Sequence, residues 1–159
     1  MKKVAVAVIT IALLVSSTIL ISAVYAKSGV KERPFKATGK GSAVALSGPP
    51  ILEIVVTGSG HSTHMGKVDI WQHHFVNIIT MTFYDGTFVW TASNGDKIEG
   101  SYYGSLIPTS AGFEIYGSFT IDGGTGRFAG ASGGGGASGM QYNDNTAELE
   151  LDGTISYGL

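Results

Sequence analysis

The alternation of apolar and polar residues along this chain is the feature that most restricts its fold. It is clearest over residues 146–157, where the apolar positions are Ala147, Leu149, Leu151, Gly153, Ile155 and Tyr157. Successive side chains of a β-strand point to opposite faces, so this pattern predicts a strand with one buried and one solvated face. The same period recurs over residues 97–106 and 113–121, and no window after residue 27 keeps a helical period. The sequence therefore predicts an all-β fold.

Turn signals divide the alternating segments from one another. They are Gly48-Pro49-Pro50, Asp85-Gly86, Asn94-Gly95-Asp96, residues 108–112 and Asn143-Asp144-Asn145. Asp-Gly and Asn-Gly are the strongest short signals for a β-hairpin. The remaining strands are expected at residues 35–46, 51–60, 67–74, 78–83, 87–92 and 132–140. This spacing predicts eight or nine antiparallel strands joined by short turns.

Glycines recur on the apolar faces of these strands, at Gly58, Gly60, Gly100, Gly104, Gly117 and Gly153. Glycine weakens a strand interior unless the strand bends or another backbone approaches closely. Repeated inward glycines suit a small closed barrel, which turns sharp corners. We therefore predict a single antiparallel β-barrel, with a β-sandwich as the alternative architecture.

Residues 121–133, which read IDGGTGRFAGASG, predict a tight connection between two strands. We expect Gly123, Gly124 and Gly126 to supply positive-φ conformations, which other residues adopt only at a cost. Phe128 and Ala131 are expected to re-enter a packed layer. Gly130 and Gly133 complete this turn motif.

The same string resembles the G-G-[ST]-G-x-F-x-G-x-x-G signature of the allene oxide cyclase-like barrels, and plant dirigent proteins carry a similar string. Secreted bacterial and archaeal proteins of unassigned function that look similar also carry elements like Thr63-His64-Met65-Gly66-Lys67 and Asn94-Gly95-Asp96. The resemblance spans residues 38–157. It implies a lipocalin-like barrel whose cavity steers the cyclisation of a lipid-derived epoxide or the coupling of phenolic radicals. No catalytic residue carries over, because the matching string is a turn.

Residues 1–26 have the features of a secretory signal peptide, expected to form a helix. Lys2 and Lys3 precede an uncharged run over residues 4–21, and Val24-Tyr25-Ala26 fits a signal peptidase site. We expect cleavage after Ala26 and a secreted or extracytoplasmic protein, with an uncleaved membrane anchor as the alternative. A basic linker over residues 27–34 and a β-barrel domain over residues 35–159 are expected to follow.

Charge is distributed unevenly and limits the partners. Residues 27–40 are basic, whereas eleven acidic residues face three basic ones from Gly41 onward. Nucleic acids are bound through clustered cations, so an acidic domain of this kind is not expected to bind them. The chain contains no cysteine, which excludes disulfides and thiol chemistry.

The four histidines, His61, His64, His73 and His74, suggest a metal site only at first sight. Strand residues three apart, like neighbours, point to opposite faces, so one residue of each pair at most reaches a shared metal. A catalytic zinc ion needs three protein ligands. A turn over residues 60–62 would relax this limit, but we predict no metal and no cofactor.

Familiar catalytic patterns are also missing. The chain has no G-x-S-x-G elbow of a hydrolase, and Gly133–Gly136 lack the Gly-Lys-[Ser/Thr] of a phosphate loop. Glu148, Glu150 and Asp152 share a face, but it is the polar face of their strand. We therefore name no catalytic residue.

Polar and aromatic residues at inward positions are the candidate ligand contacts. Counting along the strands places His64, Gln72 and His74 inward, and Trp90 and Tyr102 are large rings on apolar faces. Tyr102 lies between Gly100 and Gly104, where a ring either lines a pocket or fills the space that the glycines leave. The candidate ligand-binding residues are His64, Gln72, His74, Trp90 and Tyr102.

Three functions are compatible with such a barrel, whose interior is either filled by side chains or holds one small ligand. The first, which we favour, is binding of a small apolar ligand without catalysis. The second is a cofactor-free isomerase or cyclase acting on a lipid-like substrate. The third is a structural or surface-interaction protein with a filled barrel. Interior volume distinguishes the third function from the other two, because a drug-sized ligand needs at least about 300 Å³.

Overall fold

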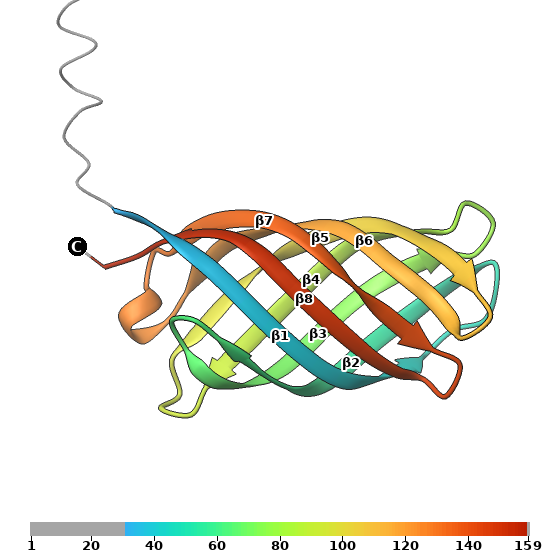
Figure 1. Ribbon diagram of the computed structural model, residues 1–159, viewed down its shortest axis with the longest axis horizontal. Coiled ribbons are helices and arrows are strands. Elements are labelled where there is room, and N and C mark those ends of the chain that lie inside the picture. Colours follow the sequence, from blue (N-terminus) through green and yellow to red (C-terminus); the bar gives the residue numbers. More distant parts are fainter. Residues whose placement is uncertain (1–30, 159) are drawn as a thin grey trace, which may run out of the picture. The chain divides into compact units, whose positions relative to one another are not determined.

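Eight antiparallel strands form one closed barrel, in which each strand pairs with the next and β8 pairs with β1 (Figure 1). The structure is a computed structural model that describes residues 31–158. The strands are β1 (Glu32–Ala45), β2 (Ile51–Ser62), β3 (Gly66–Asn77), β4 (Thr82–Ala92), β5 (Lys97–Thr109), β6 (Gly112–Gly124), β7 (Ser132–Tyr142) and β8 (Thr146–Ser156). The predicted all-β barrel of eight strands is confirmed, and the alternative sandwich is wrong.

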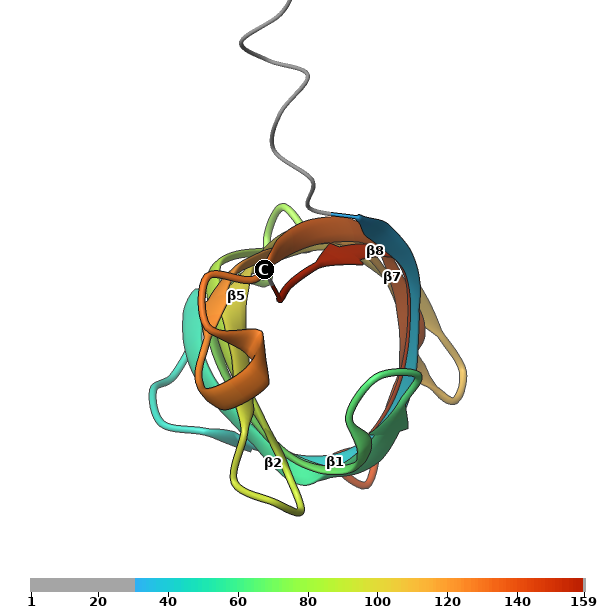
Figure 2. The same cartoon turned by 90° about the vertical axis from the view of Figure 1, so that its left-hand side faces the viewer.

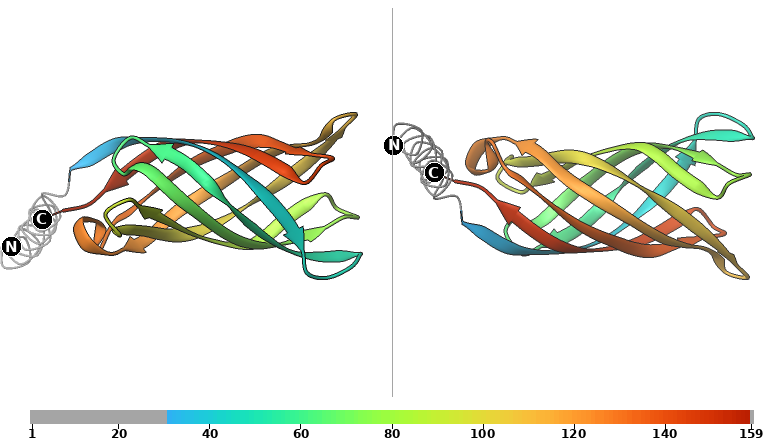
Figure 3. Two further views of the ribbon diagram at one scale, coloured as in Figure 1. Left: turned by 90° about the horizontal axis from the view of Figure 1, so that it is seen from below. Right: turned by 90° about the horizontal axis from the view of Figure 1, so that it is seen from above.

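The two ends of the barrel differ in what covers them. One end carries the start of β1, the end of β8 and the short 3₁₀ helix η1 (Gly126–Phe128), and we refer to it as the closed end. Figure 2 looks at this end and shows the η1 turn lying over part of the opening. The loops over residues 46–50, 78–81, 110–111 and 143–145 lie at the other end, the open end (Figure 3).

Apolar side chains packed inside the barrel form the core. Its most completely buried members are Phe35, Val68, Trp90, Ile98, Ile121, Phe128 and Ile155, and they gather toward the closed end. All of these except Phe128, which belongs to η1, come from strands whose sequence alternates, and the polar residues between them lie outside. The alternation thus identifies correctly which side of each strand is buried.

Asp85-Gly86 forms a β-bulge inside β4 rather than the predicted turn. Asp85 has a φ of 50°, and the register between β4 and β5 shifts between Phe83 and Gly86. The chain turns earlier, over residues 78–81, where the Asn77 side chain accepts hydrogen bonds from the backbone N–H groups of Ile79 and Thr80. The predicted strand over residues 78–83 is therefore wrong, and the strand count is eight.

The glycine-rich connection begins later than predicted, because β6 continues past Ile121 to Gly124. Gly126 has a φ of 60°, as expected for this turn, and Gly130 has a φ of 70°. Gly123 and Gly124 belong to the strand and do not have positive φ, so that part of the prediction is wrong. Phe128 is fully buried and Ala131 is nearly so, in agreement with their expected return to a packed layer.

Inward glycines lie where other groups approach closely, as their positions in the strands suggested. A Cβ atom on Gly100 would lie 2.7 Å from Cζ of Phe88, and one on Gly117 would lie 2.9 Å from Cζ of Phe83. The glycines therefore make room for rings that extend across the barrel from neighbouring strands.

The N-terminal boundary of the barrel lies before the expected Phe35. β1 begins at Glu32, because Glu32, Arg33 and Pro34 pair with the last residues of β8. The predicted signal peptide and its cleavage site lie outside the described residues. Within residues 31–158, no helix is long and apolar enough to cross a membrane.

Candidate functional site

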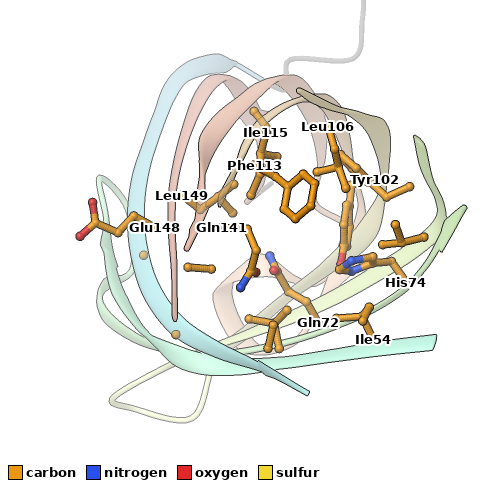
Figure 4. A pocket seen from close by; sticks show the side chains of 18 of the residues that line it. Ile54, Gln72, His74, Tyr102, Leu106, Phe113, Ile115, Gln141, Glu148 and Leu149 are labelled. Carbon is orange, nitrogen blue, oxygen red and sulfur yellow. The ribbon is translucent and has the colours of Figure 1, made fainter. Parts of the chain in front are cut away.

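The open half of the barrel contains a cavity of about 580 Å³. Side chains from around the wall point into it, among them Ile54, Leu106, Phe113, Ile115 and Leu149 (Figure 4). The interior of this barrel is therefore not filled by side chains. Its volume lies within the range of ~300–1,000 Å³ that is typical of small-molecule sites.

Small residues at inward positions explain why this half is hollow. Gly39, Gly41, Ala43 and Ala45 line the cavity from β1, and Ala147 lines it from β8. Toward the closed end the inward positions carry large rings instead, such as Phe35 and Trp90. The same alternation of faces therefore builds a packed half and a hollow half.

The floor of the cavity is also the upper layer of the core. Ile70, Phe88, Phe119 and Leu151 line the cavity and belong to the buried cluster at the same time. Because the packed core lies beneath them, the cavity does not continue to the closed end. A ligand would reach it from the open end.

His74 and Tyr102 form a hydrogen-bonded pair on the cavity wall. Nδ1 of His74 lies 2.7 Å from the Tyr102 hydroxyl oxygen, and the Phe83 ring packs against both rings. Gly86 of the bulge lies between them, since a Cβ atom there would be 2.8 Å from the Tyr102 ring. The bulge at Asp85-Gly86 thus lets the Tyr102 ring extend across β4 to reach His74.

Burial keeps both members of this pair uncharged. It lowers the pKa of His74 to about 4, with a smaller contribution from neighbouring His73. Burial alone raises the pKa of the Tyr102 hydroxyl well above its ordinary value. At neutral pH the pair consists of a neutral imidazole and a neutral phenol.

Two glutamines also extend into the cavity (Figure 4). The Gln141 amide donates from Nε2 to the carbonyl oxygen of Thr146 at 3.2 Å. The Gln72 side chain lines the cavity as well, and its amide carries both a hydrogen-bond donor and an acceptor. Gln72 thus offers both a donor and an acceptor to a molecule in the cavity.

In the described part of the chain, charged side chains do not point into the cavity. Lys40 and Glu148 are the charged residues that border it, and they pair with each other at 2.6 Å on the outer surface. Figure 4 shows the Glu148 carboxylate directed away from the interior. The lining thus combines a mainly apolar wall with a few neutral polar groups.

Three of the five predicted ligand contacts, Gln72, His74 and Tyr102, line this cavity, and two do not. β2 ends at Ser62, and His64 lies in the following turn at the closed end, where its ring contacts Pro34 and Tyr157. Trp90 is fully buried in the core beneath the cavity. The inward count for His64 required the strand to continue, and it does not.

Several residues of the site were not anticipated from the sequence: Phe83 and Gln141 line the cavity, and Gly86 lies against the Tyr102 ring. Gln141 follows the inward positions Gly135, Ala137 and Gly139 of β7, so extending that alternation to the end of the strand identifies it. Phe83 and Gly86 were concealed because Asp85-Gly86 was interpreted as a turn.

The remaining histidines lie outside the barrel. His61 is exposed, and Nε2 of His73 lies 3.0 Å from a Glu53 carboxylate oxygen. In the part of the chain that the structure describes, no three His, Cys, Asp or Glu side chains are grouped closely enough to hold a metal ion.

No family model, curated protein or solved structure matches this chain. The resemblance to allene oxide cyclase-like barrels therefore stays a prediction. The cavity itself is the feature of this chain that bears on its function.

Proposed function

We propose that this protein binds a small apolar molecule inside the barrel and does so outside the cytoplasm. The observation that carries the proposal is the cavity of about 580 Å³, which is closed below by the core and accessible from the open end. Covering apolar surface of this kind with another apolar molecule, rather than with water, lowers the free energy of the system. The signal-like segment over residues 1–26 supports export.

Catalysis by an isomerase or cyclase has one observation in its favour, the His74–Tyr102 pair inside the cavity. General acid–base catalysis works best when the pKa of the catalytic group lies near the working pH. The pKa of His74 is lowered to about 4 and that of Tyr102 is raised, so both groups exchange protons poorly at neutral pH. These shifts favour a binding protein over an enzyme.

Native mass spectrometry of protein purified from its own host tests the proposal directly. We expect a retained molecule of low molecular mass that is released by organic solvent. Recombinant protein should bind N-phenyl-1-naphthylamine, an uncharged apolar dye whose fluorescence rises in apolar surroundings.

A pair of variants on β8 locates the site. Ala147→Trp places a large ring in the cavity, and we expect it to weaken dye binding at least tenfold. Glu150→Trp places the same ring on the exposed outer face of the same strand and should leave dye binding unchanged. Equal dye binding by both variants and the wild type would contradict a site inside the barrel.

A further inference from the structure

Three of the polar side chains that line the cavity, Gln72, His74 and Tyr102, lie close together on one part of its wall. Gln72 and His74 are two residues apart on β3, so their side chains lie on the same face, roughly 7 Å apart along the strand. Tyr102 reaches His74 from β5 across Gly86. We refer to Gln72, His74 and Tyr102 as the polar wall.

The polar wall offers hydrogen bonds without charge. If the Tyr102 hydroxyl donates to Nδ1 of His74, then Nε2 carries the remaining donor and the phenol oxygen keeps an acceptor site. In the other tautomer the hydroxyl proton is free and Nε2 accepts. Either arrangement presents one donor and one acceptor, and the Gln72 amide adds another of each.

Cations are missing where an anionic ligand would need them. Among residues 31–158, no Lys or Arg side chain points into the cavity, since Lys40 is paired with Glu148 outside. The four loops of the open end also contain no Lys or Arg, and their charged residue is Asp144. A carboxylate held inside this cavity would lose water without gaining a counter-ion, which strongly disfavours the charged form.

We propose that the cavity selects an uncharged apolar ligand with a hydroxyl or carbonyl group that hydrogen-bonds to the polar wall. This inference rests on the proposed function and names the chemical class of its ligand. A long-chain alcohol or ketone fits this class, whereas the corresponding fatty acid anion does not.

Competition between matched ligands tests the inference. Decan-1-ol and decanoate have chains of the same length, and each is titrated at pH 8 against N-phenyl-1-naphthylamine bound to the protein. We expect decan-1-ol to displace the dye at least tenfold more effectively than decanoate. Equal or better displacement by decanoate would overturn the inference while leaving apolar ligand binding intact. Failure of both the dye and decan-1-ol to bind would instead overturn the proposed function.

Two variants assign the preference to the polar wall. Gln72→Leu and Tyr102→Phe remove hydrogen-bonding groups while keeping similar volume, and each should weaken decan-1-ol binding about fivefold, as expected for one hydrogen bond. Dye binding by the same variants should be unchanged, which shows that the cavity is intact. Tyr103→Phe is the matched control, because Tyr103 is exposed on the outer face of the same strand as Tyr102. An equal loss of decan-1-ol binding in Tyr103→Phe would contradict recognition by the polar wall.

Discussion

The closed half and the open half of this barrel are built by the same eight strands, yet one is packed and the other is hollow. Along β1 the inward side chain near the closed end is Phe35, which is fully buried, whereas Ala43 and Ala45 line the cavity further toward the open end. On β8, Ile155 fills the closed half and Ala147 leaves space in the open half. Alternation thus decides which side chains point inward, and their volume decides whether the interior is filled.

This division also separates stability from binding. The closed half buries large apolar side chains in contact with one another, and such burial is the main favourable term in folding. The open half exposes apolar and polar groups to an internal space, which contributes less to stability and is available to a ligand. Variants in the two halves should therefore affect different measurements.

Truncating one phenylalanine in each half should give the largest contrast. Phe35 is fully buried in the core, whereas Phe113 lines the cavity. We expect Phe35→Ala to lower the free energy of unfolding by about 3–5 kcal/mol, because it leaves a void in a packed region. Phe113→Ala should cost about 1 kcal/mol, because its ring already borders empty space. Urea denaturation measures both, and equal losses would contradict the division between the halves.

Lowering the pH should destabilise the open half through His74. Burial lowers the pKa of His74 from 6.5 to about 4, so between these values the unfolded chain binds a proton that the folded chain does not. The free energy of unfolding therefore keeps its full value above about pH 6.5 and decreases by about 2–3 kcal/mol as the pH falls toward 4.

Urea denaturation of the wild type at pH 7.5 and pH 4.5 checks this expectation against His74→Phe. The variant should lose about 2–3 kcal/mol less than the wild type over this interval. Gln72→Leu is the control, because it changes the same part of the cavity wall without removing a titratable group. The same pH dependence in the wild type and His74→Phe would show that His74 is not held neutral.

The η1 turn at the closed end should be sensitive to Gly126. This residue has a φ of 60°, and a Cβ atom there would overlap the Asp96 carboxylate, which pairs with Arg127. We expect Gly126→Val to cost about 1–3 kcal/mol in a thermal or urea melt. Gly130→Val is the matched control, because Gly130 has a φ of 70° but open space around its Cα atom. Gly130→Val should lower the free energy of unfolding by less than Gly126→Val does. An equal loss in both variants would show that backbone strain, and not the overlap with Asp96, accounts for the whole effect.

The fold was predictable from the sequence because its determinants are local. Period-two alternation identified the inward side of the strands, and inward glycines such as Gly100 and Gly117 indicated a closed barrel. The Asp85-Gly86 pair was misinterpreted because Asp-Gly suits a bulge as well as a hairpin turn. The bulge and the hairpin turn are distinguished only by the pairing of β4 with both β3 and β5.

The candidate site was partly predictable for the same reason. Gln72 and His74 followed from the alternation of β3, and Tyr102 from its flanking glycines. The 2.7 Å contact between His74 and Tyr102 was not predictable, because it depends on a bulge in the strand between them. His64 was misplaced because a count along a strand does not reveal where the strand ends.

The position of His64 leads to the smallest expected effect. Nε2 of His64 donates to the carbonyl oxygen of Pro34 at 2.7 Å, which leaves Nδ1 to accept from the Tyr157 hydroxyl at 3.1 Å. These contacts join the turn after β2 to the first and last strands at the closed end. We expect His64→Ala to lower the free energy of unfolding by about 1 kcal/mol, because it removes hydrogen bonds that are partly open to water.

Dye binding by His64→Ala completes the comparison between the two halves. Because His64 lies outside the cavity, the variant should bind N-phenyl-1-naphthylamine with the affinity of the wild type even though it melts earlier. His74→Phe should behave in the opposite way at neutral pH, with a larger effect on decan-1-ol binding than on the melt. A His64→Ala variant that melts normally but no longer binds the dye would show that the closed end takes part in binding. The separation between a closed half that stabilises the fold and an open half that binds the ligand would then be wrong.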